Sequence, residues 1–346
     1  MPEFIDTDQF LQNGQIVSGG GAKGRIVFDH SFSDIVSVEN LLTAWQEFLK
    51  GKRGKRDVQE FSLDLMGNIF TLHCDLINHT YRHGPYQAFR INDPKPRQIH
   101  KSSVRDRLLH HAVYRVLYLF FDKTFIADSF SCRLGKGTHK AMARFRAMAY
   151  QASRNHARTC WVLKCDIRKF FENIHHTILL GILERYIPGQ DIMALLKNII
   201  ESFSAKPGRG LPLGNLTSQL FVNIYMNEFD QWIKHHMKEK YYIRYADDFA
   251  IFSRDKSYLE ELLPKLASFL EEKLKLQIHP DKVFIKTLAS GIDFLGWVHF
   301  PDHRVLRTVT KRRMLKKIRL DNRPEVLASY RGLLSHGNAK KLAKKL

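Results

Sequence analysis

The segment YYIRYADDFAIFS (241–253) constrains the fold of this 346-residue chain more than any other. Apolar, β-rich residues on both sides of Ala246, Asp247 and Asp248 predict two strands joined by a tight turn. Adjacent carboxylates in such a turn repel each other and destabilise it unless a cation lies between them. A pair of Mg²⁺ ions suits this position, because hard cations bind carboxylate oxygens and keep coordination sites for phosphates. By itself, an Asp-Asp turn is equally compatible with ordinary solvated turn residues.

A third carboxylate, Asp166, ends the apolar segment WVLKCDI (161–167), 81 residues before Asp247. Taken alone, Asp166 is better explained as a helix N-cap. Nucleotidyl transfer, however, requires ligands that bridge two metal ions about 3.5–4 Å apart, one near the attacking 3′-hydroxyl and one near the leaving pyrophosphate. A strand-end aspartate and a hairpin Asp-Asp pair supply such ligands. The combination predicts a site for two Mg²⁺ ions, for which Mn²⁺ can substitute.

The charge of the chain predicts a polyanionic partner. Lys and Arg number 55 against 35 Asp and Glu, a formal net charge of +20. More than half of this surplus lies in the tail from Pro301, which is expected to be helical. An anionic membrane surface is the competing partner, but we find neither a basic amphipathic helix with an aromatic face nor an apolar run of about 20 residues. The first 15 residues do not form a signal peptide, and the four cysteines have no CxxC spacing, so a cytoplasmic location is expected.

The order of helical and extended patterns predicts an α+β fold in which helices carry an antiparallel sheet. Residues 1–33 are expected to be irregular, and GGGAKG (19–24) lacks the ending of a phosphate-binding loop, so it is interpreted as a flexible segment. Helical spacing begins after Ser33 or Asp34 and is broken by GKRGKR (51–56). A second helix is expected from about Val58 to Asn78.

Seven blocks of the sequence, in order, resemble the motifs of bacterial reverse transcriptases, and the match runs from about Tyr81 to Trp297. The blocks are KPRQIHKSSVRDRLLHHAV, SFSCRLGKGTHKA, KCDIRKFFENI, GLPLGNLTSQLFVNIYMNEFD, RYADDFAIFS, DKVFIK and GIDFLGW. The resemblance implies an RNA-directed DNA polymerase that uses dNTPs to copy template RNA into cDNA. It also implies that Asp166 and Asp247 are the metal ligands, with a less direct role for Asp248.

The same resemblance implies a right-hand polymerase fold of fingers, palm and thumb. The expected division is an irregular N-terminal extension (1–33), N-terminal helices and fingers (34–160), a palm with some fingers elements inserted (161–305), and a short basic helical thumb (306–346).

Four residues are implied by the resemblance to contact the nucleotide. Phe171 aligns with an aromatic residue that clashes with the 2′-hydroxyl of a ribonucleotide, which favours a DNA product; a core phenylalanine is the alternative. Leu213 stands where most reverse transcriptases carry a glutamine that contacts the sugar, and the missing hydrogen bond is worth roughly 0.5–1.5 kcal/mol. Nucleotide selection is therefore expected to be loose. Gly214 would let the backbone approach the incoming base pair, and Gln219 replaces the usual proline.

Triphosphate binding requires cations, and the fingers blocks supply them. The candidates are Lys95, Arg97, Arg105, Arg107 and Arg133. Surface charges or contacts to an RNA backbone explain each of them equally well. Lys282 aligns with a family lysine near the active site that could protonate the departing pyrophosphate, and a solvated strand-edge lysine is the alternative.

Two further groups are implied to hold the primer and the RNA–DNA duplex. The hairpin residues Phe294, Leu295, Gly296 and Trp297 resemble the element that grips the primer end, although core packing also explains Phe294 and Leu295. The thumb would lie along the duplex through its basic residues. These are Lys311, Arg312, Arg313, Lys316, Lys317 and Arg319.

The residue Leu213, together with CRLGKGTH, GIDFLG and SYRGLLSHGN (329–338), resembles the reverse transcriptases of diversity-generating retroelements. Such enzymes copy a template RNA inaccurately, chiefly at adenines, and act with a structured RNA and a small basic accessory protein. Retron or anti-phage defence enzymes, with template-independent or protein-primed synthesis, are the first alternative. A non-catalytic RNA-binding scaffold is an alternative of another class.

Overall fold

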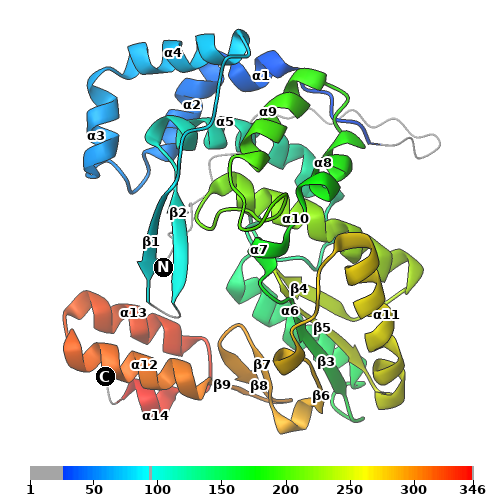
Figure 1. Ribbon diagram of the computed structural model, residues 1–346. Helices are drawn as coiled ribbons and strands as arrows, with labels where there is room; N and C mark the ends of the chain where they lie inside the picture. Colours follow the sequence, from blue (N-terminus) through cyan, green and yellow to red (C-terminus); the bar gives the residue numbers. More distant parts are fainter. Residues whose placement is uncertain (1–25, 93–95, 345–346) are drawn as a thin grey trace, which may run out of the picture. The chain divides into compact units, whose positions relative to one another are not determined.

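The computed structural model describes residues 26–92 and 96–344, and the chain divides into two compact units (Figure 1). The first unit comprises Met1–Phe125, Lys169–Asp230 and Lys273–Leu276. The second comprises Ile126–Arg168, Gln231–Glu272 and Gln277–Leu346. The predicted flexible segment GGGAKG and the candidate Lys95 lie outside the described residues. The predicted boundaries of extension, fingers, palm and thumb remain predictions.

The first unit is mainly helical. Its helices are α1 (Phe32–Val36), α2 (Val38–Phe48), α3 (Arg56–Leu63), α4 (Leu65–Ile77), α5 (Val104–Phe121), η1 (Asp122–Thr124), α7 (Phe170–Asn173), α8 (His176–Glu184), α9 (Gln190–Glu201) and α10 (Leu216–Gln231). Strands β1 (Gln87–Ile91) and β2 (Arg97–Lys101) pair as an antiparallel hairpin. Helix α5 carries much of the core, because Leu108, Leu109, Val113 and Leu117 are fully buried.

Polar side chains decide where these first helices begin. Ser31 caps α1 with a capping box, and the hydroxyl of Ser37 accepts the Asn40 backbone N–H at the start of α2. The single helix expected from Val58 to Asn78 is wrong, since Asp64 ends α3 and starts α4. Its carboxylate accepts the Gly67 N–H at 3.2 Å, which satisfies one of the unpaired donors of a helix start.

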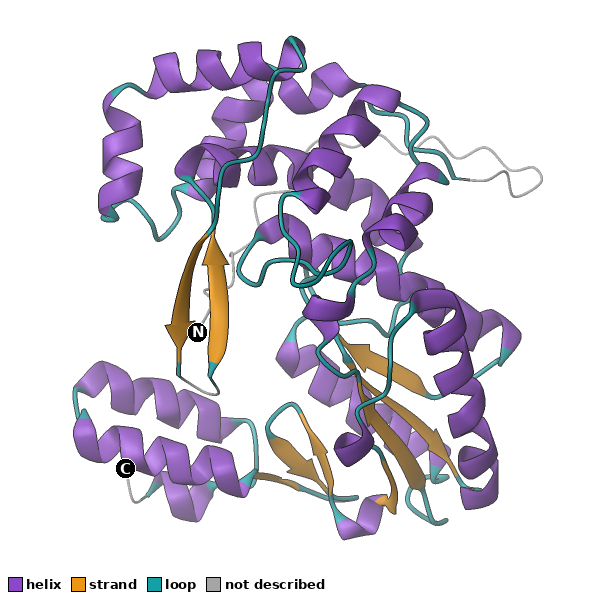
Figure 2. Ribbon diagram, in the orientation of Figure 1, coloured by secondary structure: helices purple, strands orange, loops and turns teal. Residues whose placement is uncertain are grey.

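The second unit is built on an antiparallel sheet, whose strands are orange in Figure 2. The strand order is β4-β5-β3-β6. Its strands are β3 (Trp161–Asp166), β4 (Tyr242–Tyr245), β5 (Asp248–Ser253) and β6 (Phe284–Thr287). A smaller antiparallel sheet contains β7 (Ile292–Phe294), β8 (Trp297–His299) and β9 (Arg304–Leu306). The helices are α6 (Thr138–Ala152), η2 (Trp232–His236), α11 (Lys256–Leu274), η3 (Pro280–Lys282), η4 (Leu288–Ser290), α12 (Thr308–Leu320), α13 (Pro324–Ser335) and α14 (Lys340–Ala343). Helices combined with antiparallel sheets confirm the predicted α+β class.

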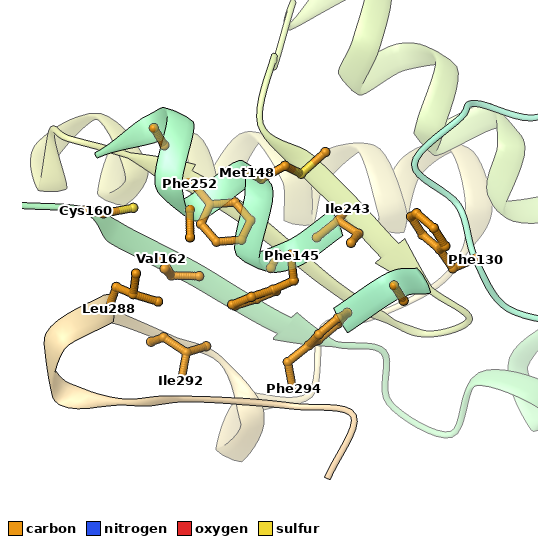
Figure 3. Packing of buried hydrophobic residues seen from close by; sticks show 14 residues of the cluster. Phe130, Phe145, Met148, Cys160, Val162, Ile243, Phe252, Leu288, Ile292 and Phe294 are labelled. Atoms are coloured by element: carbon orange, nitrogen blue, oxygen red, sulfur yellow. The ribbon is translucent and has the colours of Figure 1, made fainter. Parts of the chain in front are cut away.

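Aromatic packing fixes helix α6 against both sheets of this unit. The Phe145 ring lies 4.8 Å from the Phe252 ring on β5 and 4.8 Å from the Phe294 ring on β7 (Figure 3). All three rings are buried, and each contributes about 1.5–3 kcal/mol through removal of apolar surface from water. Helix α6 therefore supports the sheet that contains β3 and β5, the strands that carry Asp166 and Asp248.

Among the described residues, no helix combines the length and apolar character that a bilayer crossing requires.

Candidate active site

The Asp-Asp turn is a two-residue hairpin between β4 and β5. Tyr245 pairs with Asp248, which leaves Ala246 and Asp247 as the loop, and Ala246 adopts a left-handed φ of 56°. Tight hairpins of this kind require a positive φ at the first loop residue. The fully buried Arg244 stabilises the turn, because its guanidinium donates to the Ala246 carbonyl at 3.0 Å and to the Ser129 hydroxyl at 3.1 Å.

Strand pairing brings Asp166 to this turn. Asp166 lies opposite Asp248 in the β3–β5 register, and the next residue, Ile167, donates its N–H to the Asp247 carbonyl at 3.1 Å. Burial raises the pKa of the Asp247 carboxyl, and the negative charge of Asp166 raises it further. The structure therefore brings together the two aspartates that the sequence separates by 81 residues. Their role as metal ligands remains a prediction.

Lys282 joins the site from η3. Its ammonium donates to Oδ1 of Asp166 at 2.7 Å, and the side chain is 45% exposed. The His279 N–H donates to the Asp166 carbonyl at 2.7 Å, which anchors this segment to the end of β3. The lysine predicted to lie near the carboxylates is therefore beside one of them.

Lys164 was not among the residues predicted from the sequence. It lies two positions before Asp166 on β3, so both side chains are on the same face of the strand. The Lys164 ammonium forms an ion pair with Asp248 and lies 5.6 Å from the centre of the Phe294 ring. Burial lowers the pKa of Lys164 to about 8, against the attraction of Asp166. The sequence feature that could have identified Lys164 was a single lysine within an otherwise apolar strand.

The carboxylates fit a divalent cation. Asp166 and Asp247 offer hard oxygen ligands. Burial raises the pKa of the Asp247 carboxyl, and the charge of Asp166 adds a repulsion that a cation between the two carboxylates would relieve. The described ranges contain no group of three or more side chains able to hold a metal. Two carboxylates are nevertheless the usual protein share of a Mg²⁺ site that nucleotide phosphates and water complete.

The predicted nucleotide-contacting residues of the first unit lie on short helix α7, on the LPLGN loop (211–215) and on helix α10. The Phe171 carbonyl accepts the Leu211 N–H at 2.8 Å, and the Leu213 carbonyl accepts the His100 N–H of β2 at 3.0 Å. Phe171 is half-buried, with its ring 5.6 Å from that of Phe170. The structure thus brings the Phe171 segment and the LPLGN loop (211–215) together within this unit, and Gln219 follows on α10.

Gly214 has a steric role that the sequence did not reveal. Its φ is +109°, and a Cβ added to it would approach Cγ2 of Ile99 to 2.9 Å. A side chain at this position would therefore clash with strand β2 and strain the backbone. The predicted approach to an incoming base pair remains a prediction.

The candidate triphosphate-binding cations lie in different environments. Arg97 is exposed on β2, whereas Arg107 forms an ion pair with Asp57 and Arg105 one with Asp75 at 2.6 Å. Lys101 also binds Asp57, at 2.6 Å, and the Arg133 guanidinium donates to the carbonyls of Ile126 and Ser129 at 2.7 and 3.0 Å. Among these residues, Arg97 is the one that the structure presents to solvent.

The predicted primer-grip residues form the β7–β8 hairpin. Phe294 and Trp297 are buried in core clusters, so core packing accounts for both, whereas Leu295 and Gly296 form the turn with φ values of 53° and 83°. On α12, the side chains of Lys311, Arg312, Lys316, Lys317 and Arg319 are exposed and Arg313 is partly buried. Contact of these residues with a duplex remains a prediction.

Residues 91–299, more than half of the chain, match the family model described as "Reverse transcriptase (RNA-dependent DNA polymerase)". The chain belongs to the reverse transcriptase family. The family carries RNA-directed DNA polymerase activity, and this membership agrees with the carboxylates at the β4–β5 turn. The expected enzyme class is confirmed.

Curated relatives include proteins encoded in introns. Protein YkfC of Escherichia coli is 25% identical over 68% of this chain and 70% of its own length. The group II intron-encoded protein LtrA of Lactococcus lactis is 23% identical over 72% of this chain and 52% of its length. The putative COX1/OXI3 intron 2 protein of Saccharomyces cerevisiae is 20% identical over 85% of this chain and 41% of its length. The chain thus matches about half or less of the two intron proteins.

The fold is similar to that of a solved telomerase. The structure of telomerase from Candida albicans, in complex with a fragment of telomeric RNA, superposes with a TM-score of 0.52 at 12% identity. The match covers 74% of this chain and 53% of that protein. At this identity the likeness concerns the fold, and it confirms the predicted right-hand polymerase architecture.

Proposed function

We propose that this reverse transcriptase makes cDNA from a structured template RNA by two-metal nucleotidyl transfer. The observation that carries the proposal is that strand pairing brings Asp166, at the end of β3, next to Asp247 in the β4–β5 turn. Lys282 forms an ion pair with Asp166. Asp166 and Asp247 would hold the ions, with Mg²⁺ as the physiological metal and Mn²⁺ as a substitute. When bound, such ions activate the 3′-hydroxyl and stabilise the charge of the leaving pyrophosphate.

The residues around the carboxylates have separate tasks in this proposal. Lys282 is exposed enough to meet the nucleotide and would donate a proton to the departing pyrophosphate. Lys164 neutralises Asp248. Lys282 contacts Oδ1 of Asp166, so the second oxygen of Asp166 and the carboxylate of Asp247 would bind the cations. Asp248 therefore acts mainly as the partner of a buried lysine, and its direct coordination of metal is the secondary possibility.

Substrate choice is assigned to the first unit. Phe171 would exclude ribonucleotides, and Leu213, Gly214 and Gln219 would line the nucleotide with loose selection. Arg97, as an exposed cation on β2, is the favoured triphosphate contact, with Lys95 and Arg107 as further candidates. The thumb residues and the β7–β8 turn would hold the duplex.

The experiment that tests this function is primer extension on an RNA template with dNTPs and Mg²⁺. We expect Asp247→Asn to reduce incorporation about a thousandfold, since the cation supplies several kcal/mol of transition-state stabilisation. The matched control is Asp255→Asn, an exposed aspartate just past β5, which should retain wild-type incorporation. Full incorporation by Asp247→Asn would remove the metal assignment.

The biological setting is proposed from Leu213 and the SYRGLLSHGN tail, which favour a diversity-generating retroelement with a structured RNA and a small basic accessory protein. The similarity to LtrA supports a second candidate, in which the template is an intron RNA. Sequencing of the co-purifying RNA and of its cDNA separates the two. Errors concentrated at adenines support the retroelement, accurate copies of an intron support the second candidate, and template-free product points to a defence-type enzyme.

A further inference from the structure

The second unit contains a pocket of about 320 Å³ formed by residues outside the proposed catalytic set. Helix α6, the β8–β9 connection and the segment that follows α13 each contribute a wall. Phe145 and Leu288, both seen in the core of Figure 3, form part of its apolar lining. The volume lies at the lower end of the range for small-molecule sites, roughly 300–1,000 Å³.

The wall after α13 is the SHGN end (335–338) of the tail motif, which the proposed chemistry does not use. Arg304 locks it in place, because its Nε donates to the His336 carbonyl while its own carbonyl accepts the Asn338 N–H at 2.9 Å. A Cβ on Gly337 would overlap the buried Trp297 ring, at 2.1 Å from Cζ3. The segment is therefore preformed against β8 and β9 rather than free to collapse into the pocket.

The pocket is electropositive. Arg146 and Arg304 both line it, and no aspartate or glutamate is among the described residues of its lining. Within the described part of the chain, neither guanidinium has a carboxylate within 4 Å. Burial and the neighbouring charge of Arg146 lower the pKa of Arg304, as expected for two cations that share a site without an anion. Such a pair is suited to a phosphate group.

Aromatic and imidazole groups complete the lining. The Phe300 and His303 rings stack at 4.7 Å with an interplanar angle of 11°, and both border the pocket. His299 is 4% exposed, and its Nε2 has no hydrogen-bond partner among the described residues. Flat rings next to a phosphate-binding pair, with an unused polar atom in the wall, match the chemistry of a nucleotide.

We propose that this pocket binds one nucleotide unit, with its phosphate at Arg146 and Arg304 and its base beside Phe300 and His303. The site lies beyond the polymerase function, since no residue of the pocket belongs to the proposed catalytic or dNTP-contacting set. The nucleotide could be part of a bound RNA strand or a free nucleotide. A strand is favoured because a net charge of +20 attracts RNA to the chain as a whole.

The test uses the full chain and two probes, fluorescein-labelled single-stranded RNA of 12 nucleotides and fluorescent AMP, measured by anisotropy. Arg146→Gln is compared with Arg254→Gln, which removes an exposed arginine of the same unit outside the pocket. We expect Arg146→Gln to weaken binding roughly tenfold or more, the loss of one charged hydrogen bond, and Arg254→Gln to change it less than twofold. If Arg146→Gln weakens the binding of RNA but not of AMP, the pocket binds a nucleotide of an RNA strand. If it weakens the binding of both probes, the pocket also accepts free nucleotides.

A second readout keeps the result independent of other RNA contacts. RNA carrying 4-thiouridine is photocrosslinked to the chain, and the attached peptides are identified by mass spectrometry. We expect a crosslink at Phe300–His303 that Arg146→Gln weakens and Asp247→Asn leaves unchanged. Equal binding by Arg146→Gln and Arg254→Gln, or the absence of a crosslink at this segment, would overturn the proposal. Because Asp247→Asn tests catalysis separately, failure of the pocket and failure of the polymerase assignment are distinguishable.

Discussion

Two loops implicated in the reaction, one in each unit, are constrained in different ways. The Ala246–Asp247 turn of the second unit brings like charges together, so its stability depends on the cations around it, Lys164, Arg244 and Lys282. The LPLGN loop of the first unit carries no charge, and its constraint is space, since Gly214 lies against Ile99. Electrostatics thus limits the residues allowed in the Asp-Asp turn, and sterics limits those allowed in the LPLGN loop.

The largest loss of stability should follow from removal of a cation beside the Asp-Asp turn. Lys164→Met leaves Asp248 partly buried without its cation, and we expect a loss of about 3 kcal/mol in the free energy of unfolding. That figure is at the low end for broken buried pairs because the Asp248 side chain is 24% exposed. Urea unfolding followed by circular dichroism measures the loss.

Lys282→Met is the matched control for that substitution. The Lys282 side chain is 45% exposed, against 8% for Lys164, so water can replace its contact with Asp166 and the expected change in stability is below about 1 kcal/mol. Incorporation should fall about a hundredfold if Lys282 is the proton donor. Equal stability losses in the two variants would show that the greater burial of Lys164 does not make its ion pair more important for stability than that of Lys282.

Gly214→Ala tests whether the space beside Ile99 limits the LPLGN loop. The φ of +109° and the contact with Ile99 predict destabilisation by about 2 kcal/mol, together with weaker dNTP binding. Gly181→Ala, on helix α8 of the same unit, meets open space and should stabilise the chain by about 1 kcal/mol. A Gly214→Ala variant as stable as the wild type would mean that the loop adjusts freely and that space is not its constraint.

A smaller effect, shared by both units, should appear on acidification. Burial lowers the pKa of His111 to about 3, with help from Lys52, and that of His299 to about 4, with help from Arg304. Each histidine is neutral in the fold but takes up a proton in the unfolded chain below about pH 6.5. Stability should therefore fall as the pH drops from 6.5 toward 4, by about 1 kcal/mol per histidine at pH 5.5.

The measurement is urea unfolding at pH 7.5 and 5.5. His111→Phe should reduce the pH dependence, because an aromatic ring still packs on Phe48 without a titrating group. His235→Gln replaces an exposed histidine and should leave the dependence unchanged. If His111→Phe kept the full wild-type dependence, His111 would not contribute to it.

The fold class, the hairpin at Asp247 and the strand that ends at Asp166 could be predicted from the amino-acid sequence. These features follow from local patterns: β-rich flanks around a turn, apolar strands and helical spacing. Asp64 marks the limit of such patterns, because one capping side chain divided a helix that apolar spacing predicted to be continuous.

The contacts of the individual polar and small residues could not be predicted in this way. Three contacts join residues that are 50 to 115 positions apart in the sequence. They are the ion pair of Lys164 with Asp248, the ion pair of Arg107 with Asp57 and the close approach of Ile99 to Gly214. The SHGN wall of the pocket likewise depends on Trp297 and Arg304. Such contacts depend on strand register and packing across the chain, and a local pattern carries no information about which distant side chain occupies the neighbouring space.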